Sequence, residues 1–266
     1  MTKRRALGQH FLRDAGIARA IVDLVAPTAR DHVVEIGPGE GALTRPLLER
    51  VDRLSAIEID RDLAARLEAG FPSSKLSLLC ADALAFDFSS FPSGIRIVGN
   101  LPYNISTPLL FHLARYADRV RDMHFMLQRE VVERMVARPS TPDYGRLSVT
   151  LQVRFAMKKL FVVSPGAFRP PPKVESAVVR LVPLPGVSIP EKFSDIVRQA
   201  FSARRKTLRN ALGLSPGDFD ELGLDPKLRP ENLSPADYVR VAHHVADGRG
   251  VTRLPGRRAA GSSAGS

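Results

Sequence analysis

The sequence predicts an α/β protein in which a parallel sheet, covered by helices on both faces, is followed by a small all-helical domain. In the first half of the 266 residues, short apolar runs alternate with segments of helical periodicity. Such alternation is typical of βαβ units. Beyond about residue 190 the pattern is helical only, and the Pro- and Gly-containing stretch 183–190 separates the two regions.

Apolar and β-branched runs predict the strands of the sheet. The runs are 32–37, 53–59, 75–81, 95–100 and 122–128. Helical spacing of apolar residues follows the first run (Leu43, Leu47, Leu48, Val51) and the second (Leu63, Leu67, Phe71). Two more β-branched runs, 146–155 and 175–182, are expected to pair as an antiparallel hairpin at one edge of the sheet.

These patterns predict three regions along the chain. Residues 1–183 form the α/β domain with a basic N-terminal segment, and residues 190–248 form the helical domain. In the latter, Ser234 is expected to cap a helix that begins with Pro235. Residues 249–266 are rich in Gly, Ser, Ala and Arg, which predicts a disordered basic tail.

The composition favours an anionic partner and excludes several other classes. Lys and Arg number 39 against 28 Asp and Glu, a net charge of +11, which points to nucleic acid. With one cysteine, Cys80, there is no disulfide framework, and no His or Cys cluster has metal-ligand spacing. No apolar run is long enough to span a membrane and no secretory signal is present, so we expect a cytoplasmic protein. We also expect it to be a monomer.

A glycine-rich turn and two carboxylates follow successive predicted strands. Gly37, Gly39 and Gly41 lie between a strand and a helix, where backbone can approach a ligand closely. Glu58 ends the next strand, where it can accept hydrogen bonds from ribose hydroxyls, and Asp82 ends the third, near an adenine amino group. Since the turn carries no Lys or Arg for phosphates, the pattern favours S-adenosylmethionine.

The fourth strand ends in the sequence NLPY, residues 100–103. This pattern resembles the motif of methyltransferases that act on exocyclic amino groups. The lone pair of such an amine is delocalised into the base, and two acceptors aimed at its hydrogens would localise it on nitrogen. The candidates are the Asn100 side-chain oxygen and the carbonyl of Leu101 or Pro102, with Tyr103 stacking on the base. A Pro turn without this chemistry is the alternative.

A second aromatic residue is a candidate for the opposite wall of the base pocket. Phe168 precedes Pro170–Pro172, whose rigid backbone would hold the ring in place. The competing interpretation is a Phe in the hydrophobic core.

With these motifs the chain resembles the ribosomal RNA adenine dimethyltransferases, specifically the bacterial small-subunit (16S) branch. The resemblance runs from about Leu7 to Ala246 through LGQHFL, VEIGPGEGALT, GNLPYNISTPLLFHL, YGRLSV, FRPPPKVESAVVRL, RRKTLRNAL and RPENLSPADY. It implies a Rossmann-like class I methyltransferase fold and a methyl-donor site at His10, Leu12, Gly37, Glu58, Asp82 and Asn100. The family more often has Asn where His10 stands, so this residue departs from the family pattern.

The resemblance further implies the substrate. The implied reaction is the dimethylation of two adjacent adenines in a 3′-terminal hairpin of 16S rRNA, within a small subunit or its precursor. The resemblance also implies a link to ribosome biogenesis. The alternatives are a 23S rRNA dimethyltransferase of the resistance type, a DNA adenine methyltransferase and a non-catalytic RNA-binding assembly factor.

A basic run after residue 190 predicts an RNA-binding surface. We expect Arg204, Arg205, Lys206 and Arg209 to lie in one helical region, with Arg205 and Arg209 on one face. Further cations are expected at the rim of the base pocket: Arg146, Arg169, Lys173, and the N-terminal Lys3, Arg4 and Arg5. A solvated charged face is the alternative.

Overall fold

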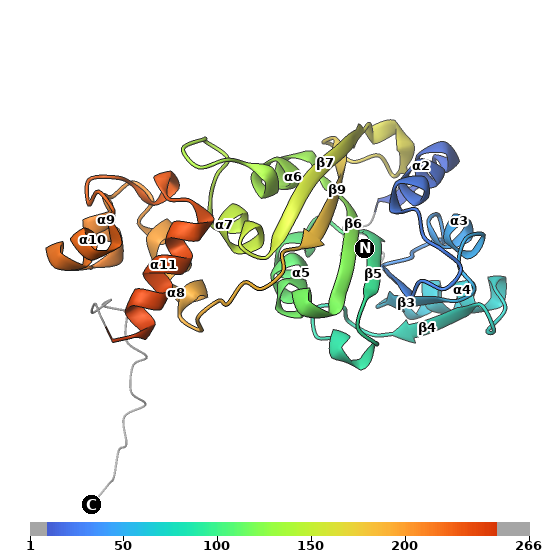
Figure 1. Cartoon of the computed structure of the whole chain (residues 1–266). Helices are drawn as coiled ribbons and strands as arrows, with labels where there is room; N and C mark the ends of the chain where they lie inside the picture. Colours follow the sequence, from blue (N-terminus) through green and yellow to red (C-terminus); the bar gives the residue numbers. More distant parts are fainter. Residues whose placement is uncertain (1–9, 249–266) are drawn as a thin grey trace, which may run out of the picture. The chain divides into compact units, whose positions relative to one another are not determined.

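The computed structural model describes residues 10–248, and the predicted basic tail and N-terminal cations lie outside this range (Figure 1). The chain forms two compact units. Of the described residues, the first unit comprises 10–136 and Arg154–Gly186, and the second comprises Ala137–Val153 and 187–248. Each unit is described by itself below.

The first unit is built on a seven-stranded sheet of order β4-β3-β2-β5-β6-β9-β7. Its parallel strands are β2 (Val33–Ile36), β3 (Leu54–Glu58), β4 (Leu76–Cys80), β5 (Ile95–Asn100) and β6 (Val120–Gln128). Two antiparallel strands, β9 (Ser176–Pro183) and β7 (Phe155–Val163), extend it beyond β6. The fold is therefore the Rossmann-like α/β class expected from the sequence.

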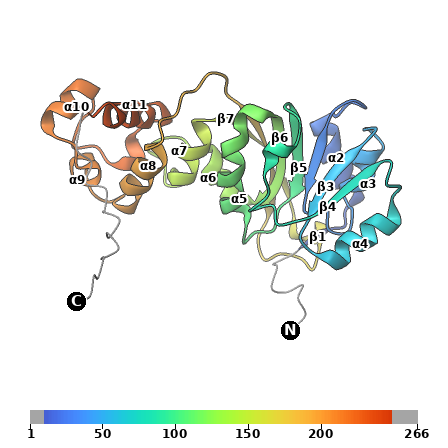
Figure 2. The same ribbon diagram turned by 90° about the horizontal axis from the view of Figure 1, so that it is seen from below.

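Helices cover both faces of this sheet. They are α2 (Ala15–Val25), α3 (Thr44–Leu48), α4 (Arg61–Gly70), α5 (Ser106–Leu113) and α6 (Arg129–Val136). Figure 2 shows α3 and α4 on one face and α5 on the other, as right-handed crossovers in opposite directions along the sheet require. The carboxyl ends of β2, β3, β4 and β5 consequently meet at one edge of the sheet, where parallel folds bind ligands.

Short elements complete the first unit. They are the short 3-10 helices η1 (Phe88–Ser90), η2 (Ala114–Arg119) and η3 (Pro165–Ala167). A two-residue strand, β1 (Phe11–Leu12), pairs antiparallel with β8 (Phe168–Arg169). The backbone amide of Arg13 also donates to the carbonyl of Ala167 at 2.8 Å. These bonds tie the start of the described chain to a segment more than 150 residues away.

The expected antiparallel edge is present, but one of its strands was placed wrongly. Residues 146–152 form helix α7 (Arg146–Gln152), and the edge strand β7 begins only at Phe155. Apolar residues at every second position, Leu147, Val149 and Leu151, are typical of a strand. The helix forms because Val149 packs into the core of the second unit and Ser148 Oγ accepts a hydrogen bond from Gly145 N at 3.0 Å.

The second unit is helical. Besides α7 it contains α8 (Phe193–Ser202), α9 (Leu208–Leu212), α10 (Pro216–Leu222), the single turn η4 (Pro230–Asn232) and α11 (Pro235–Ala246). Ser234 caps α11 as predicted, accepting a hydrogen bond from Asp237 N at 3.1 Å. Residues 137–153, which the sequence pattern assigned to the α/β domain, belong here because Tyr144 and Val149 lie in the core of this unit.

Two negative findings apply to residues 10–248. No helix in that range is long and apolar enough to cross a membrane. No group of three or more His, Cys, Asp or Glu side chains in the same range is arranged to hold a metal ion.

Candidate active site

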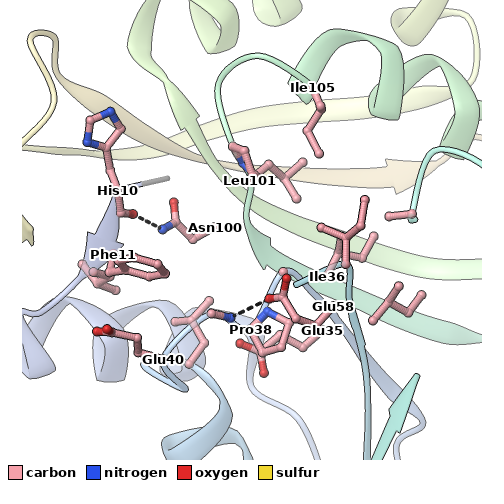
Figure 3. A pocket seen from close by; sticks show the side chains of 18 of the residues that line it. His10, Phe11, Glu35, Ile36, Pro38, Glu40, Glu58, Asn100, Leu101 and Ile105 are labelled. Carbon is pink, nitrogen blue, oxygen red and sulfur yellow. Dashed lines mark hydrogen bonds between the residues drawn. The ribbon is translucent and has the colours of Figure 1, made fainter. Parts of the chain in front are cut away.

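A cavity opens at the carboxyl edge of the parallel strands in the first unit (Figure 3). Its wall combines the glycine turn after β2, the ends of β3 and β4, the NLPY segment after β5 and the N-terminal residues His10–Leu12. Among the expected site residues, those in the lining are His10, Leu12, Gly37, Gly39, Glu58, Asp82, Asn100, Leu101, Pro102 and Tyr103.

The glycine turn depends on backbone conformations that other residues rarely adopt. Gly37, Gly39 and Gly41 have φ values of +67°, +58° and +84°. At Gly39 a Cβ atom would also lie 3.1 Å from the Phe11 ring. The Phe11 ring of the N-terminal segment therefore packs closely on the glycine turn, at a position where a larger residue would crowd it.

Glu58 is buried at the end of β3, with 2% of its surface exposed. Its Oε2 accepts a hydrogen bond from Gly39 N at 3.1 Å and its Oε1 accepts one from Asp60 N at 3.0 Å. Burial raises the pKa of Glu58, and these backbone bonds oppose that shift. The carboxyl group thus holds the glycine turn while its remaining lone pairs are available to ribose hydroxyls.

Asp82 lies at the surface end of the cavity, beyond β4. Its Oδ1 accepts a hydrogen bond from Leu84 N at 2.9 Å, which fixes a tight turn. Ile59 follows Glu58 and lines the cavity with 50% of its surface exposed. This exposed Ile beside Glu58 offers an apolar face to the cavity, a feature of the site that the sequence analysis missed.

The charge of the lining restricts the ligand. Four carboxyl groups contribute to it, those of Glu35, Glu40, Glu58 and Asp82, whereas no Lys or Arg between residues 10 and 248 does. Burial keeps Glu35 largely protonated at neutral pH, and Glu40 forms an ion pair with Arg13, so the wall is less negative than the four groups suggest. It still suits a ligand with hydroxyls and positive charge better than phosphates. The ribose, adenine and sulfonium of S-adenosylmethionine fit this set of groups.

Glu35 is a site residue that the sequence analysis missed, since it reads as part of a buried strand. It is 1% exposed, and its Oε2 accepts a hydrogen bond from Thr44 Oγ1 at 2.7 Å. Burial raises the pKa of Glu35 to about 8, with the hydrogen bond from Thr44 opposing the shift and the nearby Glu58 adding to it.

The Asn100 side chain is oriented by a residue 90 positions away. Its Nδ2 donates to the backbone carbonyl of His10 at 3.0 Å (Figure 3). With the amide nitrogen engaged in this way, Oδ1 is the acceptor that Asn100 offers to a ligand. The contact also shows that His10 reaches Asn100 through backbone, which the residue type at position 10 does not determine.

The two carbonyls considered as the second acceptor differ in their surroundings. The Pro102 carbonyl accepts hydrogen bonds from Ser106 Oγ at 2.9 Å and Ile105 N at 3.2 Å. Ser106 is the first residue of α5, and Ile105 occupies the cap position. Because both lone pairs of Pro102 are used, the Leu101 carbonyl is the better candidate for a substrate amine.

Tyr103 is held at both ends of its ring. Its hydroxyl forms a 2.6 Å hydrogen bond with Ser176 Oγ, and the His10 ring lies 5.3 Å from its centroid at an interplanar angle of 37°. Burial raises the pKa of Tyr103, so this ring is neutral at ordinary pH. A fixed, neutral aromatic ring is a suitable surface for stacking a base.

Phe168 does not fit the expected role of a second wall. It is 2% exposed and lies in the core cluster with Leu12 and Ala18, and it is not part of the cavity lining. Its pairing with Leu12 across β1 and β8 turns it inward. Its neighbours Arg169 and Lys173 are exposed in the first unit.

The expected RNA-binding residues of the second unit divide into two groups. Arg204 forms an ion pair with Glu231 at 2.6 Å and donates to the Pro142 carbonyl at 2.8 Å, so it braces the unit. Arg205, Lys206 and Arg209 are exposed, and Arg146 is exposed at the start of α7. The expected shared helical face of Arg205 and Arg209 is absent, because only Arg209 lies in α9 and Arg205 belongs to the preceding turn.

Comparison with known proteins decides the family. The profile described as "Ribosomal RNA adenine dimethylase" matches residues 1–247. The chain belongs to the ribosomal RNA adenine dimethylase family. Among its relatives, the "Ribosomal RNA small subunit methyltransferase A" of Thiobacillus denitrificans is 58% identical over 92% of this chain and 98% of the relative. The protein of that name from Chromobacterium violaceum is 57% identical over 92% of this chain and 96% of the relative.

Solved structures agree with this family assignment. A dimethyladenosine transferase from Plasmodium falciparum superposes with a TM-score of 0.76 at 25% identity, over 91% of this chain and 99% of the other. The "23S rRNA methyltransferase ErmE" superposes with a TM-score of 0.65 at 26% identity, over 89% of this chain and 99% of the other.

Proposed function

We propose that the protein uses S-adenosylmethionine to dimethylate the exocyclic amino groups of two adjacent adenines in a 3′-terminal hairpin of 16S rRNA. The substrate is a small ribosomal subunit or its precursor, and the enzyme acts as a monomer in the cytoplasm. The family and the names of the relatives at 58% and 57% identity support the reaction and the small subunit. The net charge of +11 supports an RNA partner.

The observation that carries the chemistry is the Asn100 amide. With Nδ2 bonded to the His10 carbonyl, Oδ1 is presented as an acceptor beside the Leu101 carbonyl. These two acceptors bind the hydrogens of the adenine amine, localise its lone pair on nitrogen and stabilise the positive charge that develops there. No general base is required, because the amine attacks uncharged and loses its proton afterwards.

The target adenine has to leave its stack, which costs a few kcal/mol. Stacking on Tyr103, whose ring is held by Ser176, offsets part of this free energy. On the other side of the cavity, Glu58, Asp82 and the glycine turn hold S-adenosylmethionine, which supplies the electrophilic methyl group when bound. Exposed cations, among them Lys173 in the first unit and Arg146, Arg205, Lys206 and Arg209 in the second, contact RNA phosphates.

The experiment that tests this function compares three substrates. Purified protein is incubated with labelled S-adenosylmethionine and undermethylated small subunits, large subunits or duplex DNA, and the methylated nucleoside is identified by mass spectrometry. We expect dimethyladenosine from small subunits alone. Label in large subunits or DNA would contradict the substrate, and saturable RNA binding without any label would indicate a non-catalytic assembly factor.

A further inference from the structure

A second groove adjoins the active-site cavity of the first unit, between the starts of α2 and α3. These two helices lie side by side (Figure 1). The groove has a volume of about 410 Å³. Leu12, Glu40 and Ala42 line both the groove and the cavity, so the two are continuous. The proposed reaction leaves this groove without a role, because the methyl donor and the target adenine both lie in the cavity.

The carboxyl groups of the groove are mostly engaged within the protein. Asp14 accepts hydrogen bonds from the first amides of α2, at 2.9 and 3.0 Å, and so caps that helix. Glu40 forms an ion pair with Arg13 at 2.5 Å. Glu49, exposed at the end of α3, is the third carboxyl group of the lining. Two of the three negative charges are therefore compensated.

Two arginine side chains of the groove are not compensated. Arg19 on α2 and Arg45 on α3 are exposed, and neither forms an ion pair with a carboxylate of residues 10–248. Asp23 lies four residues after Arg19, but it pairs with Arg50 at 2.7 Å. The Arg45 guanidinium lies over the Phe71 ring, 5.1 Å from its centroid. The groove thus presents one unpaired guanidinium group from each helix.

Unpaired guanidinium groups favour a phosphate partner. Their N–H donors match two phosphate oxygens at once, and they keep their charge at every ordinary pH. Continuity with the cavity favours the phosphates of a strand over a free anion. An RNA strand whose adenine enters the cavity has to leave along the rim, and it carries one phosphate for every nucleotide.

We propose that this groove binds the phosphodiester backbone of the RNA strand beside the target adenine, through Arg19 and Arg45. The inference rests on the proposed function, because RNA is the substrate there. It gives the strand a contact on the α2–α3 side of the cavity, whereas Arg169 and Lys173 belong to the segment that follows η3. Phosphate contacts of this kind set the position of a strand and carry no sequence information.

The salt dependence of binding tests the charge assignment. The Kd for undermethylated small subunits is measured at several salt concentrations. Arg19→Gln and Arg45→Gln should each lower the slope of log K against log salt by about 0.7–0.9, and the double variant should bind about tenfold more weakly. Arg19→Lys and Arg45→Lys keep the charge and should keep most of the slope. Glu49→Gln removes a carboxylate that repels phosphate and should tighten binding.

The matched control is Arg66→Gln. Arg66 is exposed on α4 and lines neither the groove nor the cavity. Its loss lowers the net charge by the same amount and should leave the slope unchanged. An unchanged slope in Arg19→Gln and Arg45→Gln would overturn the proposal. An equal change in Arg66→Gln would overturn it as well, because the effect would then belong to net charge.

A tethered cleavage reagent tests the location of the strand. Cys80 is the one cysteine of the chain, so Arg19→Cys in a Cys80→Ser protein gives a single attachment point. Iron-EDTA attached there should cut 16S rRNA within the 3′-terminal hairpin, and the same reagent at Arg66→Cys should not. Absence of cuts in that hairpin from Arg19→Cys would overturn the proposal. If wild-type protein makes no methyladenosine while binding and cuts follow these expectations, the proposed reaction fails and the groove assignment stands.

Discussion

Ser106 Oγ donates a hydrogen bond to the Pro102 carbonyl at 2.9 Å, from a side chain that is 1% exposed. With the bond from Ile105 N, it closes the NLPY segment onto the first turn of α5. These two hydrogen bonds therefore attach the segment that carries Asn100 and Leu101 to the start of the helix that follows it. The same bond removes Pro102 from the set of acceptors open to a substrate.

The first prediction concerns this brace. Ser106→Ala should lower the free energy of unfolding by about 1 kcal/mol, because one buried hydrogen bond is lost while Ile105 N still satisfies the carbonyl. It should also lower kcat, since the loop that orients the acceptors becomes looser. Urea unfolding and methyl-transfer assays measure the two effects. Wild-type stability together with wild-type kcat would show that the bond has no role.

A second prediction follows from the buried carboxyl of Glu35. Its pKa is raised to about 8 in the folded protein from an ordinary value of 4.5. Between these values the folded state binds more protons than the unfolded chain, so this group makes stability fall as the pH rises from about 4.5 to 8. Glu35→Gln should remove that loss. Melting temperatures of both proteins should diverge above pH 5 in favour of the variant, and parallel curves would contradict the assignment.

Glu58→Ala tests the ribose carboxylate. The substitution leaves the buried amide of Gly39 and the half-buried amide of Asp60 without their acceptor. We therefore expect the free energy of unfolding to fall by about 2 kcal/mol. The affinity for S-adenosylmethionine should fall at least about tenfold, as one charged hydrogen-bond partner is removed.

Asp60→Ala is the matched control for Glu58. Asp60 caps α4 through the amides of Asp62 and Leu63 and does not line the cavity. Its loss should cost about 1 kcal/mol of stability and leave cofactor affinity unchanged. Equal losses of cofactor affinity in the two variants would assign the effect to general destabilisation.

The basic residues of the second unit should separate by role. Arg205→Ala and Arg209→Ala should each lower the slope of log K for RNA against log salt by about 0.7–0.9, the value for one phosphate contact. Arg204→Ala should instead lower stability by about 1 kcal/mol, because it breaks the bonds to Glu231 and Pro142. Arg198→Ala, at an exposed ion pair with Asp195, should change neither quantity much. An unchanged slope in Arg205→Ala and Arg209→Ala would contradict the assignment to RNA.

Sequence patterns predicted the parts of the fold that depend on local periodicity. The parallel strands and the convergence of Gly37, Glu58, Asp82 and Asn100 at one edge follow from alternating apolar runs and strand ends. The period-two pattern around Val149 is typical of a strand, but these residues form a helix. Long-range packing in the second unit stabilises the helix, and a local pattern does not show that packing.

Details of the site depend on contacts that sequence spacing does not reveal. The Asn100 amide is oriented by His10, 90 residues earlier, and the Tyr103 hydroxyl by Ser176, 73 residues later. The burial of Phe168 follows from strand pairing with Leu12, which no local pattern indicates. Family resemblance could name these positions, but it could not assign their side-chain orientations.

The central claim is that the Asn100 Oδ1 atom accepts a hydrogen from the reacting amine. Its most direct test is the single-turnover rate of methyl transfer to undermethylated small subunits, with enzyme and S-adenosylmethionine both saturating. Because saturation removes differences in binding, the Asn100→Ala variant should show a rate about 10²–10³ lower than wild type, as for the loss of one preorganised hydrogen-bond partner of developing charge. A rate within a few-fold of wild type would contradict the account.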